Sequence, residues 1–387
     1  MSVIIETDKQ YIANTYARFP IELVSGKGSI VVDSNGIEYI DLGSGIAVTS
    51  FGIADTQWIS TVTEQLNKIQ HTSNLYYTEP CALLAKMLCE RTGMKKVFFS
   101  NSGAEANECA IKAARKYAAE KKGADCHTII TLENSFHGRT LTTLSATGQP
   151  HYHALFQPLT PGFLHTPAEN TGALKKLVRE NKIAAIMIEC IQGEGGVNSL
   201  SVEYVKAISE ICKEEDILLI VDEVQTGNGR TGELYAYMNY GIKPDIVSTA
   251  KGLGGGLPLA ACMLGDKVEN ILGFGDHGST FGGNPVCCAG AISILQRIDS
   301  VFLAEVKRKS QYIFDTLSEC KGIRSISGMG LMIGIETEKP ASEVVKLCME
   351  KGVLCLTAKN KVRLLPALNI PFKTLVKAID IIKSVCA

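Results

Sequence analysis

Lys251 and Asp222 are the residues of this sequence whose types and positions indicate chemistry most directly. Asp222 ends the apolar run 217–222, and Lys251 ends the run 245–251 and opens a glycine-rich turn. Both runs predict buried strands, and ligands of open α/β sheets bind at the carboxyl ends of strands. An amine and a carboxylate placed there suit pyridoxal phosphate (PLP): the lysine would form a Schiff base and the carboxylate would keep the pyridine nitrogen protonated. A structural ion pair is the alternative, and these two residues alone do not decide between them.

A helix start suited to phosphate is the second feature. Residues 97–99 predict a short strand, and a long helix is expected over about 104–121. Ser102 and Gly103 lie at the junction, where free amides bind phosphate and glycine lets the backbone approach closely. The alternative is an ordinary N-cap in which Ser102 pairs with Glu105.

Three further loops carry groups that a planar, anionic ligand would use. Phe136 offers an aromatic face and Arg139 a guanidinium fork for a carboxylate, although a loop phenylalanine beside a solvated arginine is the alternative. Glu189 ends the strand expected at 183–189 and Glu194 follows in a glycine-rich loop, where a polar turn is the alternative. The loop 278–285 adds the hydroxyls of Ser279 and Thr280, which could bind an anion.

Several other kinds of site are disfavoured. The run 251–256 lacks the G-x-G-x-x-G spacing of a dinucleotide fingerprint. Neither a G-x-x-x-x-G-K-[ST] loop nor a G-x-S-x-G elbow is present, which argues against a P-loop enzyme and an α/β-hydrolase. His151 and His153 are close in sequence but have no nearby cysteine or carboxylate to complete a metal site, so no metal is expected.

Bulk composition narrows the class of protein. A chain of 387 residues is long enough for two domains. The net charge of −1 provides no basic field for nucleic acid or an anionic membrane, and no segment approaches 18 uninterrupted apolar residues. The thirteen cysteines are scattered without a C-x-x-C pair, and the N-terminus lacks a signal-peptide core. We therefore expect reduced thiols, a cytoplasmic location, and no nucleic-acid or membrane partner.

The order of expected elements predicts an α/β fold with two domains. Strands and helices alternate through the middle of the chain, which favours a mostly parallel sheet covered on both faces. After Pro285 the pattern becomes α+β, beginning with a long helix over 289–317 that is broken near Asp299. A hairpin over 28–42 is expected to join this second domain. The expected division is a joining segment at 1–45, a large domain at 46–288 and a small domain at 289–387.

Together, these motifs resemble the class III PLP-dependent aminotransferases, from about Tyr11 to the last helix. The resemblance implies fold type I, with a large domain of mostly parallel sheet and a smaller α+β domain. It also implies PLP as cofactor, a homodimer and small-molecule substrates. Three stretches, 45–48, 74–77 and 356–366, are most similar to the members that transaminate N2-acetyl-L-ornithine with 2-oxoglutarate.

Several related activities remain open at this point. Ornithine, succinylornithine or 4-aminobutyrate could replace acetylornithine, because these donors differ by few contacts. An aminomutase or decarboxylase on the same fold, or a binding protein that keeps the fold without catalysis, are further alternatives.

The resemblance also assigns a role to individual residues. It implies that Lys251 bonds to the cofactor and moves the proton, and that Asp222 pairs with the pyridine nitrogen. It implies a shared phosphate site, with Thr280 supplied by the partner subunit. The remaining assignments are Ser102, Gly103 and Ala104 for the phosphate; Val224 and Phe136 for the two ring faces; Gln225 for the ring hydroxyl; Arg139 for the substrate α-carboxylate; Ser279 and Tyr16 for substrate contacts; and Glu194 with Arg363 as a switch pair.

Three positions depart from the family pattern. Ala104 stands where threonine or serine is often found, so one phosphate hydroxyl is missing. Cys190 stands where proline is usual, and 52–56 replaces a G-H-x-H-P loop. None of these removes a catalytic group, although the first is expected to weaken cofactor binding modestly.

Overall fold

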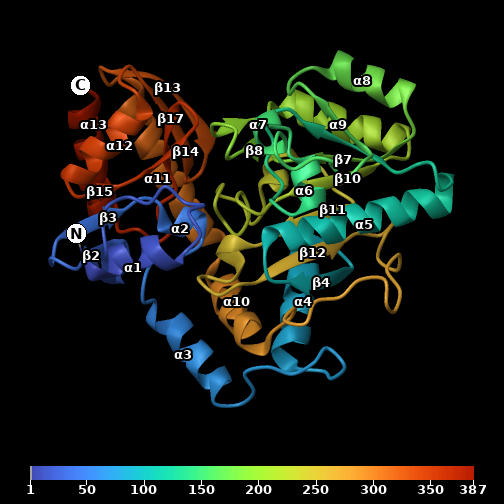
Figure 1. The fold of residues 1–387 in the computed structure, drawn as a ribbon, viewed down its shortest axis with the longest axis horizontal. Coiled ribbons are helices and arrows are strands. Elements are labelled where there is room, and N and C mark those ends of the chain that lie inside the picture. The colour runs from blue at the N-terminus through green and yellow to red at the C-terminus, as the bar shows by residue number, and fades with distance from the viewer. Residues whose placement is uncertain (1) are drawn as a thin grey trace.

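A seven-stranded sheet forms the centre of the larger region of the protein (Figure 1). The structure is a computed structural model that describes residues 2–387. Strand β12 is antiparallel to both of its neighbours, whereas the other pairs are parallel, so the expected mostly parallel sheet is confirmed. In spatial order the strands are β4 (Lys96–Ser100), β12 (Ala260–Leu264), β11 (Ile246–Thr249), β10 (Leu218–Asp222), β7 (Ile183–Ile188), β5 (Thr128–Leu132) and β6 (Phe163–Thr166).

Both faces of this sheet are covered by helices. Successive side chains of a strand point to opposite faces, and β10 follows this rule. Leu218 and Ile220 pack with α5 (Gly103–Lys122), whereas Leu219 and Val221 pack with α9 (Val202–Glu214). The same alternation places Asp222, at the end of β10, on the α5 face. The helices on the α9 side include α4 (Glu79–Thr92), α8 (Thr171–Glu180) and α10 (Pro285–Arg297).

The smaller region combines both ends of the chain (Figure 1). The expected hairpin is confirmed as β2 (Ile30–Asp33) and β3 (Glu38–Asp41), and β3 pairs in parallel with β15 (Val353–Leu354). That sheet also contains β1 (Leu23–Lys27). A second sheet is antiparallel, and three helices complete the region. These elements are β13 (Ile323–Met329), β14 (Met332–Thr337), β17 (Lys361–Leu364), β16 (Leu356–Ala358), α11 (Ser300–Ser318), α12 (Ala341–Glu350) and α13 (Phe372–Cys386).

The expected break near Asp299 is confirmed. The Asp299 carboxylate accepts a hydrogen bond from Phe302 N (2.8 Å) and so caps the start of α11. Helix α10 begins at Pro285, four residues before the expected start at 289, because the Asn284 side chain caps it. Most of α10 packs into the core of the large region, whereas Val306, further along in α11, packs into the core of the small one.

Among residues 2–387, no single helix is long and apolar enough to cross a membrane. The pair α10 and α11 meets the length and composition criterion only when taken together, and it is bent by 75°.

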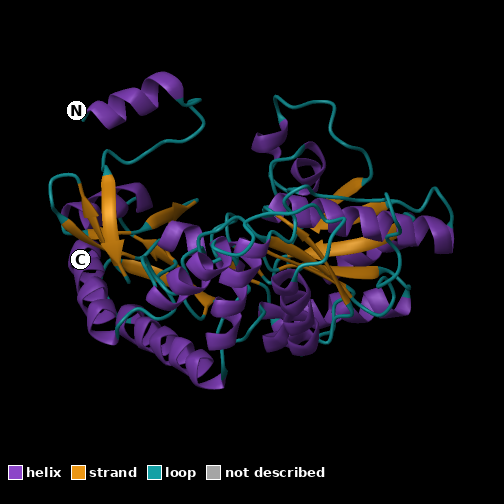
Figure 2. Ribbon diagram, turned by 90° about the horizontal axis from the view of Figure 1, so that it is seen from below, coloured by secondary structure: helices purple, strands orange, loops and turns teal. Residues whose placement is uncertain are grey.

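Helix α1 (Val3–Tyr11) has no buried residue and stands away from the rest of the chain (Figure 2). Short elements complete the fold. They are α2 (Ser44–Ala47), α3 (Thr56–Leu66), α6 (Leu141–Ala146), α7 (Pro150–His153), β8 (Ile191–Gln192), β9 (Asn198–Ser199), η1 (Ala236–Tyr240) and η2 (Lys251–Leu253).

Candidate active site

Asp222 is held by a set of hydrogen bonds that the sequence motifs did not predict. Its Oδ2 accepts hydrogen bonds from Asn107 Nδ2 (2.7 Å) on α5 and lies 2.8 Å from His137 Nδ1, and its Oδ1 accepts one from Val224 N (3.0 Å). Asn107 also donates to the carbonyl of His137 (2.8 Å). Asp222 is therefore a buried carboxylate whose orientation is fixed by two side chains from different elements.

His137 and Glu189 continue this buried polar group. Burial alone would lower the pKa of His137, but the hydrogen bond and charge of Asp222 outweigh it, and the pKa is raised. Burial raises the pKa of Glu189 to about 7, against the charge of His137. Glu189 accepts hydrogen bonds from the backbone N–H groups of Phe136 (2.9 Å) and Gly193 (3.4 Å), so it joins two loops of the site.

Lys251 occupies a strained position at the carboxyl end of β11. Its φ angle is +46°, in the left-handed region that non-glycine residues rarely adopt and that is common at functional sites. Burial lowers the pKa of the amine, and the nearby charges of Glu194 and Arg363 act on it in opposite directions. Across the described residues, its amine makes no hydrogen bond. Lys251 thus presents an amine that is easier to deprotonate than usual.

The start of α5 shows both features that its sequence suggested, an N-cap and free backbone amides. Ser102 caps the helix: its hydroxyl accepts a hydrogen bond from Glu105 N (3.3 Å) and donates one to Glu105 Oε2 (2.9 Å), which also accepts one from the backbone N–H of Asn101 (3.0 Å). The N–H groups of Gly103 and Ala104 have no acceptor within the described chain, so they remain available to an anion.

Gly103 lies directly against Val224. A Cβ atom at Gly103 would lie 2.6 Å from Val224 Cγ1, which is closer than real contacts allow. The start of α5 can therefore pack against the loop after Asp222 only because residue 103 has no side chain. This close packing brings the free amides next to Val224, beside the Asp222 carboxylate.

Glu194, Arg363 and Gln225 form a second polar group. Arg363 Nη1 lies 2.6 Å from Glu194 Oε1 and 3.3 Å from Gln225 Oε1, and Gln225 Nε2 donates to Glu194 Oε1 (3.4 Å). Burial would raise the pKa of Glu194, but Arg363 and Lys251 lower it, so the carboxylate is charged beside the guanidinium. Arg363 is buried, and its Nε has no partner among residues 2–387.

Phe136 and Arg139 lie together in the loop after β5. The Arg139 guanidinium lies over the Phe136 ring (5.7 Å to the centroid) and over the Tyr152 ring (4.9 Å). Arg139 is exposed and has neither a hydrogen bond nor an ion pair in the part of the chain that the structure describes. Its guanidinium donors are therefore free to bind a carboxylate.

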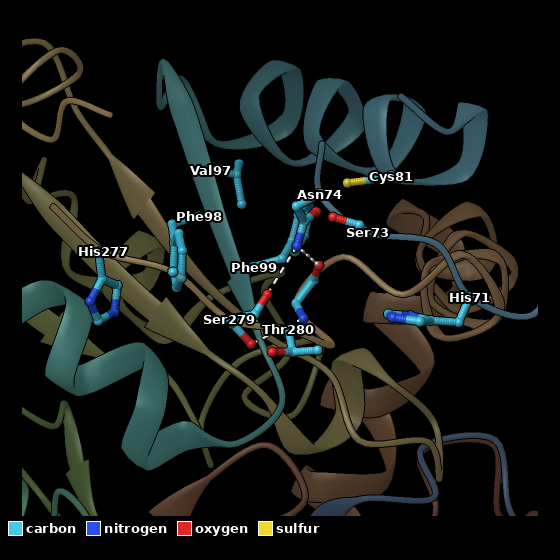
Figure 3. A pocket seen from close by; sticks show the side chains of 12 residues that line it. His71, Ser73, Asn74, Cys81, Val97, Phe98, Phe99, His277, Ser279 and Thr280 are labelled. Carbon is cyan, nitrogen blue, oxygen red and sulfur yellow. Dashed lines mark hydrogen bonds between the residues drawn. The ribbon is translucent and has the colours of Figure 1, made fainter. Parts of the chain in front are cut away.

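Thr280 and Ser279 lie in a different cavity of the same chain (Figure 3). This cavity has a volume of about 680 Å³, and neither Lys251 nor Asp222 lines it. Asn74 holds the loop by donating to the carbonyls of Ser279 (3.0 Å) and Gly282 (2.9 Å). The hydroxyl of Thr280 has no partner within residues 2–387.

Tyr16 is also separate from the site in this chain. It is 70% exposed, and its ring contacts the guanidinium of Arg18 (5.3 Å). The structure thus brings most of the predicted residues together but leaves Ser279, Thr280 and Tyr16 outside the group around Lys251.

The observed donors fit PLP. The unpartnered amides at the start of α5 suit its phosphate, the fixed Asp222 carboxylate suits its pyridine nitrogen, and the Lys251 amine suits its aldehyde. Within the described chain, no group of three or more His, Cys, Asp or Glu side chains could hold a metal ion. All thirteen cysteines are free.

The sequence motifs do not identify Asn107 and His137 as functional candidates, and they include Glu189 without a specific role. His137 stands inside the loop motif that includes Phe136 and Arg139, and Asn107 lies one turn beyond the start of α5. A polar residue within an otherwise apolar helix face was the available signal for Asn107. The local sequence around Asn107 or His137 does not indicate a contact with Asp222. The group is identified only because the three side chains meet in the folded structure.

Comparison with known proteins gives consistent matches. The sequence model "Aminotransferase class-III" matches residues 11–386. The acetylornithine aminotransferase of Haemophilus ducreyi is 51% identical over 98% of this chain and 97% of its own length. That of Caldanaerobacter subterraneus is 45% identical over 98% of each chain.

Solved structures agree with these matches. An ornithine aminotransferase from Toxoplasma gondii, described with partial occupancy of PLP at its active site, has a TM-score of 0.94 and 33% identity, covering 99% of this chain and 93% of its own. The N-acetylornithine aminotransferase of Stenotrophomonas maltophilia K279a has a TM-score of 0.85 and 32% identity, covering 98% of each chain.

Proposed function

Because this chain belongs to the class-III aminotransferase family of PLP-dependent enzymes, we propose that it transfers the δ-amino group of N2-acetyl-L-ornithine to 2-oxoglutarate. The products would be N-acetyl-L-glutamate 5-semialdehyde and L-glutamate, a step of arginine biosynthesis. The observation that carries this proposal is the pair of guanidinium groups in the site. Arg139 is open, whereas Arg363 is paired with Glu194. Such a pair suits a donor with one carboxylate and an acceptor with two, and the names of the relatives at 45–51% identity favour the acetylated donor.

The division of labour between Lys251 and Asp222 follows from their surroundings. When bound, PLP supplies an electron sink that eases removal of a proton from the carbon bearing the substrate amine. Lys251 would hold the cofactor covalently and, once displaced by the substrate, its Nζ would take that proton from the substrate carbon and deliver it to the carbon that was the aldehyde carbon of PLP. The lowered pKa of Lys251 favours the neutral amine that this role needs. Asp222, fixed by Asn107 and His137, would keep the pyridine nitrogen protonated.

The other cofactor contacts are proposed from where the residues lie in the candidate active site. The free amides of Gly103 and Ala104, with the Ser102 hydroxyl, would bind the phosphate. Val224 and Phe136 would cover the two ring faces. Gln225, which now bonds to Glu194 and Arg363, would turn its amide toward the ring hydroxyl.

The two substrates would use the guanidinium groups differently. Arg139 would bind the α-carboxylate of the donor in a bidentate manner. Arg363 would remain paired with Glu194 while the donor is bound, because an unpaired buried charge is costly. When 2-oxoglutarate enters, Glu194 would swing aside and release Arg363 for the second carboxylate. Ser279 and Tyr16 would contribute substrate contacts from outside this group.

We also propose that the active enzyme is a homodimer in which Thr280 of one protomer completes the phosphate site of the other. Four exposed residues support a covered surface here. Leu75 is 85% exposed, Tyr76 70% and Tyr77 104%, and Phe281 beside Thr280 is 59% exposed. Exposed apolar side chains gathered in this way mark an interaction surface. Asn74, which precedes the first group, holds the loop that carries Thr280.

The domain division and location remain proposals. Residues 46–288 would form the large domain, and 1–45 with 289–387 the small one, although α10 and the following Ile298 pack with the large core. We propose a cytoplasmic location because the thirteen cysteines are free and most of them are buried.

A half-reaction assay tests the proposed function. The purified protein, loaded with PLP, is mixed without acceptor with N-acetylornithine, ornithine, succinylornithine or 4-aminobutyrate, and the absorbance of the bound cofactor is followed. We expect the fastest conversion with N-acetylornithine and none in the Lys251→Ala variant. Faster conversion by another donor would keep the family and reject this substrate, whereas turnover that never needs 2-oxoglutarate would indicate a mutase or decarboxylase.

A further inference from the structure

Tyr152 contacts two residues of the proposed site without having been assigned any role. Its ring lies 4.9 Å from the Arg139 guanidinium carbon, measured to the ring centroid. It also meets the Phe136 ring edge to face, with centroids 5.8 Å apart and planes at 67°. The Arg139 guanidinium therefore contacts two aromatic rings, one of which is proposed to cover the cofactor.

The turn that carries Tyr152 is firmly anchored on both sides. Gln149, just before α7, is buried and donates its side-chain amide to the carbonyl of Ser135 (3.1 Å). His153 Nε2 lies 2.7 Å from the carbonyl of Thr147 and 2.9 Å from that of Leu144. The backbone N–H of Tyr152 donates to the carbonyl of Gln149 (3.0 Å). Tyr152 is thus a partly buried ring on a fixed turn rather than a mobile surface side chain.

A ring holds a guanidinium in a way that a carboxylate cannot. The attraction between a cation and an aromatic face leaves the N–H donors of the guanidinium unused. An Asp or Glu partner would occupy those donors and neutralise the charge. Arg139 shows the consequence, because it has a fixed neighbour but no hydrogen-bond acceptor in the described part of the chain. Arg363 illustrates the opposite arrangement, since Glu194 accepts a hydrogen bond from its Nη1.

We propose that Tyr152 is a positioning residue for the substrate carboxylate: it orients the Arg139 guanidinium while leaving all its donors free. This inference rests on the proposed function, because it takes Arg139 as the carboxylate site. It predicts that Tyr152 determines the preference for amines that carry a carboxylate over those that do not. The hydroxyl of Tyr152 is not needed, since the face of the ring makes the contact.

The test separates binding of the carboxylate from chemistry. Wild type, Tyr152→Ala, Tyr152→Phe, Arg139→Ala and a control on the same loop, Leu155→Ala, are compared as PLP-loaded enzymes. Leu155 is 91% exposed. The probes are N-acetylornithine, N-acetylputrescine, which lacks only the α-carboxylate, and N-acetylnorvaline, which keeps the carboxylate but lacks the reacting amine. Steady-state rates give KM and kcat for the first two, and calorimetry gives the Kd of the third.

For Tyr152→Ala we expect the KM of N-acetylornithine and the Kd of N-acetylnorvaline to rise about three- to tenfold. A rise of this size corresponds to the loss of one cation–π contact and of the guanidinium orientation that it maintains. kcat/KM for N-acetylputrescine should not change. Tyr152→Phe and Leu155→Ala should behave as wild type. In the Arg139→Ala background, Tyr152→Ala should have no further effect on the Kd of N-acetylnorvaline.

Two results would overturn the inference. Equal losses for N-acetylornithine and N-acetylputrescine in Tyr152→Ala would mean a merely structural role, and failure of Tyr152→Phe to restore binding would mean that the hydroxyl acts instead. If Arg139→Ala itself leaves the Kd of N-acetylnorvaline unchanged, the proposed carboxylate site is wrong, which is a separate failure from that of Tyr152.

Discussion

Glu189 is a buried carboxyl of the candidate active site, and no role in binding or catalysis is assigned to its charge. Its carboxyl receives the backbone N–H groups of Phe136 and Gly193. These bonds tie the loop that carries Phe136 to the loop that carries Glu194. A carboxyl whose pKa lies near neutrality therefore links the proposed cofactor cover to the proposed substrate switch.

The first prediction concerns the pH dependence of stability. Because the folded-state pKa of Glu189 is raised from 4.5 to about 7, its favourable contribution is full below about pH 4.5 and is lost as pH rises through about 7. Over this range the free energy of unfolding of the wild type should fall by up to about 3 kcal/mol, at about 1.4 kcal/mol for each pKa unit. The Glu189→Gln variant should not show this loss. The difference in Tm, variant minus wild type, should become more positive from pH 5 to pH 8, as measured by thermal unfolding.

Glu194→Gln provides the matched control. The pKa of Glu194 is lowered, so its contribution is present above its ordinary value of 4.5 and is lost as pH falls below it. The difference in Tm for this variant should change only on the acid side. A flat difference for Glu189→Gln across pH 5 to 8 would refute the assignment of a shifted carboxyl.

At the scale of elements, the start of α5 is placed by its contact with the loop after β10. Gly103 has no side chain, and Val224 fills the space in which a Cβ atom would lie. This contact sets the distance between the free amides at the start of the helix and the Asp222 carboxylate. One missing methyl group therefore fixes the spacing between the proposed phosphate site and the proposed ring site.

The second prediction follows from this contact. Gly103→Ala should force Val224 to shift, because the new Cβ would lie 2.6 Å from Val224 Cγ1. Such overpacking costs about 1–3 kcal/mol. Because relieving it displaces the amides from the phosphate, the Kd of PLP should rise by up to about 150-fold, at about 1.4 kcal/mol for each tenfold change. Fluorescence titration of the apoenzyme measures it.

The double variant Gly103→Ala/Val224→Ala is the control for the cause. It removes both methyl groups of Val224 that the new Cβ would meet, so its PLP affinity should return to that of Val224→Ala alone, which lacks the same contact with the ring. Unchanged PLP affinity in Gly103→Ala would place the cofactor elsewhere.

At the scale of the whole molecule, a buried arginine connects the large region of the protein to the small one. Arg230, in the loop after β10, donates Nη1 to the carbonyls of Leu331 (3.0 Å) and Pro366 (2.6 Å) in the small region. Burial lowers its pKa to about 9, and no carboxylate faces it among the described residues. The two regions are thereby joined by a buried cation bound to backbone carbonyls, close to the strand that carries Arg363.

The third prediction tests whether the site is shared between protomers. Lys251→Ala and Thr280→Ala chains, co-expressed with different tags, form mixed dimers. If Thr280 serves the partner's site, one site of each mixed dimer has both native residues, and half of the sites should bind PLP covalently with wild-type affinity. Titration at limiting PLP followed by borohydride reduction and mass spectrometry counts these sites.

A second mixed dimer, in which one chain carries both substitutions, is the control for this experiment. A Lys251→Ala/Thr280→Ala chain paired with wild type leaves no site with both native residues if Thr280 acts across the interface. Wild-type affinity in this second mixture, and not in the first, would place Thr280 in the site of its own chain.

Local pattern was enough to predict most elements. The apolar run 217–222 corresponds to β10, the helix expected at 104–121 corresponds to α5, and the hairpin at 28–42 and the break near Asp299 are confirmed. These succeed because strand and helix periods and capping residues act over a few positions. Helix α10 begins four residues before the expected start because the Asn284 side chain caps it and Pro285 fits its first turn, whereas the local pattern alone is typical of a loop there.

By itself, the sequence determined which strand ends carry Asp222 and Lys251, which helix start carries Ser102 and Gly103, and which family the chain resembles. The tertiary structure alone decided that Asn107 and His137 meet on Asp222, and that Tyr152 lies against Arg139. The physical reason is the range of the interactions. Periodicity and capping operate between neighbours in the chain, whereas these contacts join side chains 115, 85 and 13 positions apart, whose approach depends on how the sheet and its loops pack.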